Sequence, residues 1–427
     1  MNGRWFLFRR FSRALWFLPA LFCASAVIVL LLAFFSAGLF PKDFDEATLP
    51  VTVSAEALRN ILSIVAASML TVAVFALSTL VNLLTSAAQT GSPRAVPLFS
   101  GNRAARTTIS VFIGAFLFSI IGIIGLSSGI YSIGGRLILF LATLVVVLAV
   151  VWALIRWVRE ISVVGRVVEM TSRLEDATRQ ALRRLGADGL YGCSAAAGDT
   201  GDGRAVTAGA VGFVQHFDPQ ALQERAEEHD LVLRVLVRPG DYVDHRTVLA
   251  TASGDAGPDD LEAIRSAFIV GEERTFDSDP GFGFLVLADV ARRALSPGIN
   301  DPSTAIHVLT VQTRLLGDWM VEAADGEDAE PPYPRVALAA VTPARLLDEA
   351  FRPISYEAAS AAPDVGRALL RALSSLARVA PEAFGDAAAG LAEDFIARAA
   401  SEAGHAPDIA ALREAAAGIG GAAKREG

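Results

Sequence analysis

Five polar side chains recur along a stretch that is otherwise apolar and carries no charge, residues 60–93. At about 100° per residue they fall within about 40° of one line along a helix; they are Thr71, Ser78, Asn82, Thr85 and Gln89. Polar side chains in hydrocarbon turn toward protein or water. The pattern therefore predicts either hydrogen bonds between helices or the lining of a polar path. The absence of Asp, Glu, Lys and Arg from this stretch favours helix packing, because ion pathways often place a charge there.

A second group of polar residues follows far along the chain and could converge on one site. Its members are Arg274, Asp279, Asp289, Arg292, Ser296, Asn300 and Asp301. They show no nucleophile–base pair, metal set or phosphate loop at a recognisable spacing, so we expect no enzyme. Residues 296–302 contain two Pro, one Gly, one Asn and one Asp, which predicts a rigid connector rather than a ligand loop.

Three expectations concern the chemistry of this connector. Asp301 should cap a helix that begins at Pro302, which has no amide hydrogen to leave unsatisfied. Gly298 should adopt a positive φ that other residues avoid.

The residue types present exclude several kinds of chemistry. The only lysines are Lys42 and Lys424, so the long region between them cannot form a Schiff base or carry a Walker-type lysine. Cys23 and Cys193 fit neither a disulfide framework nor a zinc site, and the five histidines lack ligand spacing. The sequence thus predicts no cofactor and no metal.

Four long uncharged stretches lie in the first 156 residues. A bilayer core about 30 Å thick needs roughly 20 apolar helical residues, so we expect spans at about 14–40, 61–86, 108–130 and 137–155. The first stretch is longer than the 7–15 apolar residues typical of a signal peptide, which favours a retained span. Residues 1–156 are therefore predicted to be a four-span transmembrane domain.

Arginine placement predicts the orientation. Arginines cluster before the first span, between spans two and three, and after span four, and such clusters mark the cytoplasmic side. We expect an inner-membrane protein of a bacterial cell with both termini and the 85–106 loop in the cytoplasm. Residues 1–156 hold 11 Lys+Arg and 4 Asp+Glu, a net charge of +7, whereas residues 157–427 have a net charge of −16. The acidic part argues against nucleic acid as a partner.

The composition of spans three and four predicts different surroundings. Span three is rich in small residues that allow close helix packing, within one bundle or between subunits of a homo-oligomer; they are Gly114, Ala115, Ser119, Gly122, Gly125 and Gly129. Gly125 and Gly129 form a GxxxG pattern. Span four has no small-residue face and is typical of a helix that faces lipid.

The remaining chain predicts a cytoplasmic α+β domain. Residues 157–208 suggest a helical stalk and a Gly-rich linker, residues 209–256 a small β-rich module, and residues 257–427 a mostly helical region in which 325–334 are an acidic loop. Residues 237–243 and 247–250 resemble the hairpin of biotinyl and lipoyl carrier domains, but the modified lysine is missing. At most the fold of that hairpin is shared.

Two further segments resemble a known family. One comprises Gln89, Ser92-Pro93-Arg94, Asn102-Arg103 and Gly114-Ala115-Phe116; the other runs from Glu273-Arg274 through Asp279-Pro280 and Phe282-Gly283 to residues 294–302. The chain is similar, to about residue 360, to the bacterial predicted membrane proteins of domain of unknown function 2254. Members of that family often have an acid where this chain has Asn102. The resemblance implies the architecture and supplies no activity.

Two hypotheses for function remain. The first is an oligomeric channel or transport-related protein with a cytoplasmic regulatory domain. The second is a membrane-anchored sensor or interaction module without a pore. The transported ion or small-molecule ligand is not specified by the sequence.

Overall fold

The chain folds into two compact units. In the computed structural model, the described residues are 17–35, 54–90, 92–100, 103–131, 133–163, 167–196, 203–324, 330–359, 363–402 and 405–419. One unit, here the membrane unit, holds residues 7–89 and 96–169; the other, the soluble unit, includes Thr90–Ala95 and Met170–Gly427.

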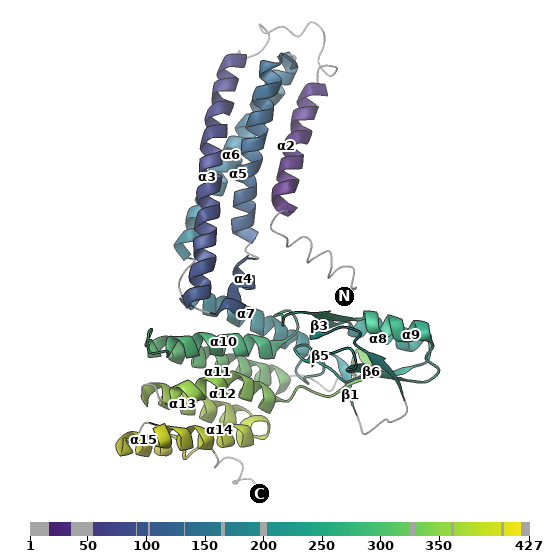
Figure 1. The fold of residues 1–427 in the computed structure, drawn as a ribbon, viewed down its shortest axis with the longest axis vertical. Coiled ribbons are helices and arrows are strands. Elements are labelled where there is room, and N and C mark those ends of the chain that lie inside the picture. The colour runs from purple at the N-terminus through teal and green to yellow at the C-terminus, as the bar shows by residue number, and fades with distance from the viewer. Residues whose placement is uncertain are drawn as a thin grey trace. The chain divides into compact units, whose positions relative to one another are not determined.

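The membrane unit is built from long apolar helices (Figure 1), namely α2 (Phe17–Phe35), α3 (Ala55–Thr90), α5 (Arg103–Ser127) and α6 (Ile133–Val163), with the short α4 (Val96–Ser100) before α5. Among the described residues, three segments are long and apolar enough to cross a bilayer: Ala55–Asn82, Arg106–Ser127 and Gly134–Arg159. They correspond to the second, third and fourth predicted spans. The first predicted span, 14–40, is described only in part, as the uncharged 19-residue α2, so a fourth span stays a prediction.

Helix α5 is the packing centre of the membrane unit. Of its membrane window, 56% is buried, against 28% for α3 and 22% for α6. Phe112 and Phe118 lie in two clusters that α3 and α6 complete, and Gly114 lets α5 approach Phe22 of α2 closely. Small residues of α5 therefore serve packing within this chain.

The GxxxG pattern predicted for this span is wrong as a helix-packing motif. Gly129 lies beyond the end of α5, has φ +64° and meets no atom within 4 Å of a built Cβ, so it is a turn residue. Gly125 packs instead under the Tyr131 ring, where a Cβ would come within 2.4 Å of a ring carbon.

The soluble unit begins with elements in the segment predicted to be a stalk and linker. That segment contains α7 (Val167–Leu185), β1 (Cys193–Ala195) and β2 (Arg204–Thr207). Leu174, Ala181 and Leu185 of α7 are fully buried. Because α7 packs its apolar face into the unit, the folded region starts well before residue 209.

Two sheets form one side of the soluble unit. The larger has the order β1-β8-β4-β6-β2 and the smaller the order β5-β3-β7, with α8 (Pro219–Glu228) and α9 (Pro258–Ser266) beside them; the other strands are β3 (Gly212–Phe217), β4 (Val232–Val235), β5 (Tyr242–Val243), β6 (Val248–Ser253), β7 (Phe268–Gly271) and β8 (Tyr333–Leu338). Strand β8 runs parallel to β1 and β4 and places Val336 and Leu338 in the core. The sheets therefore include strands that lie outside the predicted β-rich module, residues 209–256.

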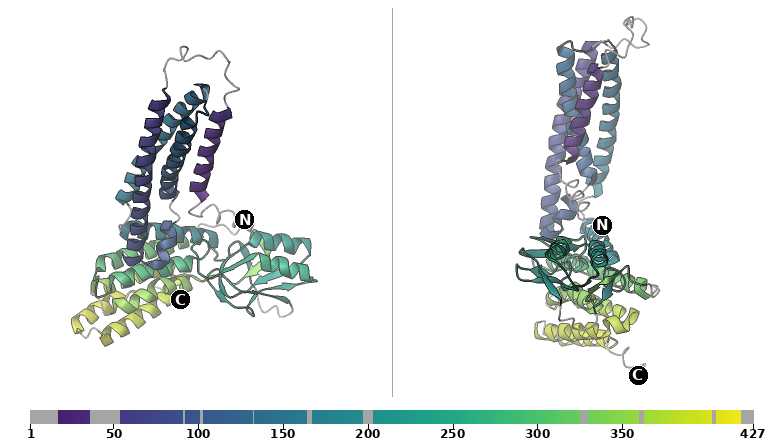
Figure 2. Two further views of the ribbon diagram at one scale, coloured as in Figure 1. Left: turned by 45° about the horizontal axis from the view of Figure 1, so that its top comes forward. Right: turned by 90° about the vertical axis from the view of Figure 1, so that its right-hand side faces the viewer.

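Six helices stack on the other side of the soluble unit (Figure 1); they are α10 (Pro280–Ala294), α11 (Pro302–Ala324), α12 (Pro343–Ala358), α13 (Pro363–Val379), α14 (Pro381–Glu402) and α15 (Ala406–Ala416). Each of α10 to α13 packs on the next helix but one, which gives two layers. Five of the six begin at a proline, whose fixed φ and missing amide hydrogen suit the first helical position. Figure 2 shows the stack and the sheets from two further sides.

Candidate functional site

The polar residues predicted along span two lie on the exposed side of α3. The buried side is formed by small and aliphatic residues, namely Leu58, Leu62, Ala66, Met69, Ala73 and Ala76. Thr71, Ser78, Asn82 and Thr85 are exposed, and together they are here the α3 polar face. The exposed side of α3 therefore carries these polar residues among large apolar ones, such as Leu70, Val74 and Val81, whereas its buried side is apolar throughout.

Hydrogen bonding on the α3 polar face is unequal. The hydroxyl of Thr71 donates to the Ala67 carbonyl at 3.2 Å, and that of Thr85 to the Val81 carbonyl at 3.0 Å. Asn82 has no hydrogen-bond partner among the described residues, and the Gln89 side chain lies outside them. Hydroxyls satisfied by the preceding turn are tolerated in hydrocarbon, whereas a carboxamide needs a partner from elsewhere.

The second predicted group does not form one site, because a helix separates its members. Asp279 caps the start of α10, whereas Asn300 and Asp301 follow its end; fifteen residues at 1.5 Å each amount to about 22 Å. Between them, Arg292 pairs with Glu357 at 3.1 Å. The group therefore splits into a cluster before α10, contacts along α10 and the corner after it.

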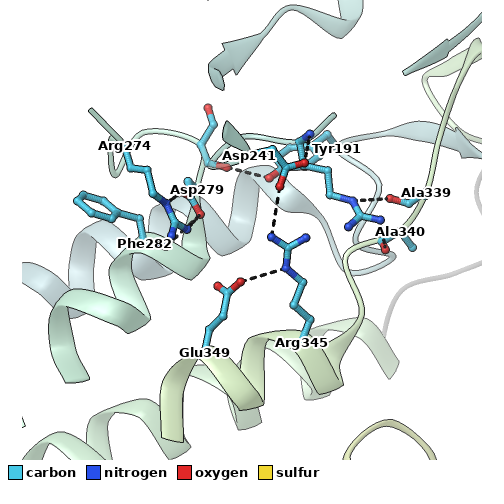
Figure 3. Close-up of polar contacts among 11 residues, drawn as sticks. Tyr191, Asp241, Arg274, Asp279, Phe282, Ala339, Ala340, Arg345 and Glu349 are labelled. Atoms are coloured by element: carbon cyan, nitrogen blue, oxygen red, sulfur yellow. Dashed lines mark hydrogen bonds and ion pairs between the residues drawn. The ribbon is translucent and has the colours of Figure 1, made fainter. Parts of the chain in front are cut away.

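Before α10, Arg274 and Asp279 form a two-point ion pair. The Arg274 Nε and Nη2 atoms lie 2.7 and 3.0 Å from the two Asp279 carboxylate oxygens, and the guanidinium also stacks over the Phe282 ring (Figure 3). The Asp279 Oδ1 atom accepts the Phe282 amide at 3.0 Å, so the same carboxylate caps α10. Asp279 is 4% exposed. A buried carboxylate needs such partners, because an unpaired one costs several kcal/mol.

A second set of ion pairs adjoins the first and joins the sheet side to α12. Arg345 Nε donates to Glu349 at 3.0 Å, and its Nη2 lies 3.4 Å from Asp241. Asp241 accepts the Arg238 amide at 2.8 Å, while the Arg238 guanidinium donates to the carbonyls of Ala339 and Ala340. Figure 3 shows Arg345 between Glu349 and Asp241. We call all six side chains the charged cluster: Arg238, Asp241, Arg274, Asp279, Arg345 and Glu349.

Two glycines allow the backbone to approach the carboxylates of the charged cluster. Gly240 has φ +96°, and a Cβ there would lie 2.3 Å from the Asp279 carboxylate. A Cβ at Gly281 would lie 1.9 Å from the Glu349 carboxylate. The backbone therefore approaches both acids more closely than any side chain would permit.

Burial governs the titration of the groups around the cluster. It raises the pKa of Asp279 above its usual value, although the Arg274 hydrogen bonds act in the opposite direction. Burial, and next the charge of Asp279, raises the pKa of the Tyr191 phenol, whose hydroxyl donates to the Ser278 carbonyl at 2.8 Å. Burial lowers the pKa of His216, whose Nδ1 lies 2.9 Å from the Ser278 hydroxyl.

The His216–Ser278 contact is a nucleophile–base arrangement that sequence spacing did not reveal. Ser278 is only 3% exposed, so the native surface does not present its hydroxyl to a substrate. The charged cluster likewise pairs each of its carboxylates with an arginine. In the described residues, the carboxylates of the charged cluster thus serve structural ion pairs.

The corner after α10 bears out one expectation and corrects another. The Thr304 amide and hydroxyl donate to the Asp301 carboxylate at 3.1 and 2.6 Å, which confirms the predicted cap and lowers the pKa of Asp301. The positive φ belongs to Asn300, at +49°, and not to Gly298, so that prediction is wrong. The Asn300 backbone amide donates to the Ser296 carbonyl at 2.9 Å, and the left-handed residue lies two positions later than expected.

The two segments that carry the family resemblance meet on α10. The Arg94 guanidinium lies 3.0 Å from the Asp289 carboxylate, which also accepts the Ser92 hydroxyl at 3.3 Å. Ser92 is 2% exposed, and Arg94 lies in the 3₁₀ turn η3 (Pro93–Ala95). The start of the α3–α5 connection, residues 92–95, therefore folds as part of the soluble unit.

These features define a membrane protein with at least three spanning-length helices and a soluble unit of helices and sheets. The chain belongs to the family of predicted membrane proteins DUF2254, whose profile matches residues 12–375. It is 35% identical over 104 residues to the uncharacterised proteins Mb1321c of Mycobacterium bovis and Rv1290c of Mycobacterium tuberculosis. Those residues are 23% of this chain and 20% of each relative, so the match spans about a fifth of their length. No solved structure matches the chain.

Gly240→Ala tests the close approach at the charged cluster. The substitution places a Cβ against the Asp279 carboxylate at a strained φ, so we expect it to lower the free energy of unfolding by about 1–3 kcal/mol. Gly298→Ala is the matched control, because its Cβ would meet no atom within 4 Å. Thermal unfolding of the full chain in detergent measures both. Equal midpoints for the two variants would contradict the account.

Substitutions at Asn300 test the corrected corner. Asn300→Gly should leave stability nearly unchanged, since glycine accepts φ +49°, whereas Asn300→Val should cost about 1–2 kcal/mol. Asp301→Ala should cost about 1 kcal/mol through loss of the cap. Thermal unfolding midpoints rank the three variants. If Asn300→Gly lowered the midpoint as much as Asn300→Val, the Asn300 carboxamide, and not its backbone conformation, would stabilise the 296–302 connector.

Proposed function

We propose that this protein is an oligomeric channel or transport-related protein of the bacterial inner membrane, and not an enzyme. Copies of the chain meet through the α3 polar face, and the soluble unit regulates the assembly from the cytoplasm. The observation that carries the proposal is the outward direction of the α3 polar face.

The energetics of hydrocarbon support this association. A carboxamide transferred to a medium without partners costs about 4–8 kcal/mol, so Asn82 favours a surrounding of protein or water over acyl chains. Ser63, Ala67 and Thr71 recur at intervals of four on the same exposed side of α3. Small residues at that spacing allow two helices to approach closely and to exchange hydrogen bonds.

A second function has an observation in its favour. No Asp, Glu, Lys or Arg lies between residues 60 and 93, and ion pathways often carry one. A membrane-anchored sensor or protein-interaction module would use the same α3 contact for assembly and would have no pore. The two functions differ in whether water reaches the α3 polar face.

Cysteine crosslinking tests the assembly. In a background without native thiols (Cys23→Ala, Cys193→Ala), we expect Ser78→Cys and Asn82→Cys to form disulfide-linked dimers in native membranes under mild oxidation. Val145→Cys is the control, because Val145 is 65% exposed but lies on α6. Crosslinking at Val145 with none at Ser78 would contradict the proposed contact.

A membrane-impermeant thiol reagent then separates the two functions. Reaction at Ser78→Cys in the crosslinking-competent assembly supports a water-filled path. Protection of that cysteine in an assembly that still crosslinks favours the sensor without a pore.

The topology is a separate proposal with its own test. The Arg94–Asp289 contact supports placing the α3–α5 connection and the soluble unit on one side, which agrees with the two crossings made by α5 and α6. Reporter fusions at Ser100 and Ser194 should read cytoplasmic, and one at Thr48 external. An external signal at Ser100 would contradict the arrangement.

A further inference from the structure

Helix α6 carries charges at a separation that fixes its depth in a bilayer. Arg136 and Arg156 bound an uncharged run, residues 137–155, and twenty residues at 1.5 Å each rise about 30 Å. This length equals the thickness of a typical hydrocarbon core. Arg156 therefore lies at the boundary with the headgroups, and Trp152 lies one turn further inside.

One face of α6 forms a continuous exposed strip that ends at this boundary. Leu141, Val145, Leu148 and Trp152 follow at intervals of four, three and four, and are 52%, 65%, 61% and 50% exposed. Such spacing places them on one side of the helix. The strip is long enough to contact one acyl chain over several turns and leads directly to the arginines.

The polar end of the strip is organised for an anion. The Arg156 guanidinium lies 5.2 Å from the centre of the Trp152 ring, which holds it over the outer face. Arg159 is exposed seven residues after Trp152, on the same side. Glu160 is the one acidic residue on α6 and offsets one of the two arginine charges, which leaves a net charge of +1 at this end of the helix.

We propose that this face of α6 is a binding site for an anionic phospholipid. The acyl chain lies along Leu141, Val145 and Leu148, and the headgroup phosphate accepts hydrogen bonds from Arg156 and Arg159. Guanidinium groups bind phosphate oxygens through two parallel hydrogen bonds, and basic residues at this level attract anionic lipids. The apolar strip makes a membrane lipid, rather than free phosphate, the ligand. This site does not depend on the proposed function of α3.

The test measures lipid selection by the full chain in detergent. Native mass spectrometry with equal amounts of phosphatidylglycerol and phosphatidylcholine reports which lipid is retained. We expect the wild-type chain to prefer phosphatidylglycerol, and Arg156→Gln and Arg159→Gln each to reduce that preference by roughly fivefold. Trp152→Leu keeps the apolar strip but releases Arg156, and should reduce the preference less than Arg156→Gln.

Two controls make the result decisive. Arg59→Gln removes an exposed arginine from the first turns of α3 and should leave the preference unchanged. Unfolding midpoints in phosphatidylcholine should match wild type for every variant, and Arg156→Lys and Arg159→Lys, which keep the charge, should keep most of the preference. No preference in the wild-type chain, or an equal loss in Arg59→Gln, would overturn the site. Displacement of phosphatidylglycerol by inorganic phosphate at equal concentration would identify a simple anion site and overturn the phospholipid proposal.

Discussion

The carboxylate of Asp279 is the point on which the soluble unit depends. It caps α10, pairs with Arg274 through both oxygens and lies against the backbone of Gly240, so one side chain serves the helical stack and the sheet turn together. A buried charge persists only when its partners satisfy it, because desolvation of an ion costs several kcal/mol. This requirement explains why residue 240 is a glycine, which lets the 238–241 turn approach the Asp279 carboxylate. The ion pair of Arg345 with Asp241 also holds that turn.

A different constraint orders the membrane unit, where hydrocarbon replaces water as the solvent. Helix α5 is buried by its neighbours and keeps small residues, whereas α6 exposes a broad apolar surface. Helix α3 is in conflict with this rule at one point, because its exposed side places Ser78 and Asn82 among large apolar residues such as Val74 and Val81. The conflict disappears if protein or water covers that side, and the gain need not be large, since hydrogen bonds between membrane helices average about 0.6 kcal/mol.

Helix starts could be predicted from residues next to one another in the sequence. Strand pairing and ion pairs between distant residues could not. The sequence predicts the start of α11 from Asp301-Pro302, because a cap and a first-turn proline act within four residues, and α8 begins with the same pair of residue types, Asp218-Pro219. Strand β8 was not predicted, since its parallel partners lie roughly a hundred residues earlier. The charged cluster was not predicted for the same reason. Asp241 and Arg345 are about a hundred residues apart and meet only in the folded chain, so their spacing in the sequence does not indicate the contact. The prediction of a positive φ at Gly298 was wrong because glycine and asparagine both occur in left-handed positions. The hydrogen bond from the Asn300 amide to Ser296 forms only in the folded chain.

The contact of Ser92 and Arg94 with Asp289 gives the two family-like segments a shared physical role. The pair is only partly buried, with Arg94 55% exposed, so its contribution to stability is small, typically under about 1 kcal/mol. An interaction of that size is poorly suited to holding a fold together and well suited to being made and broken. Asp289 lies on α10, whose start is fixed by Asp279, while Arg94 directly follows α3 in the chain. The Asp289 carboxylate therefore joins α10 to the residues that follow α3 in the chain.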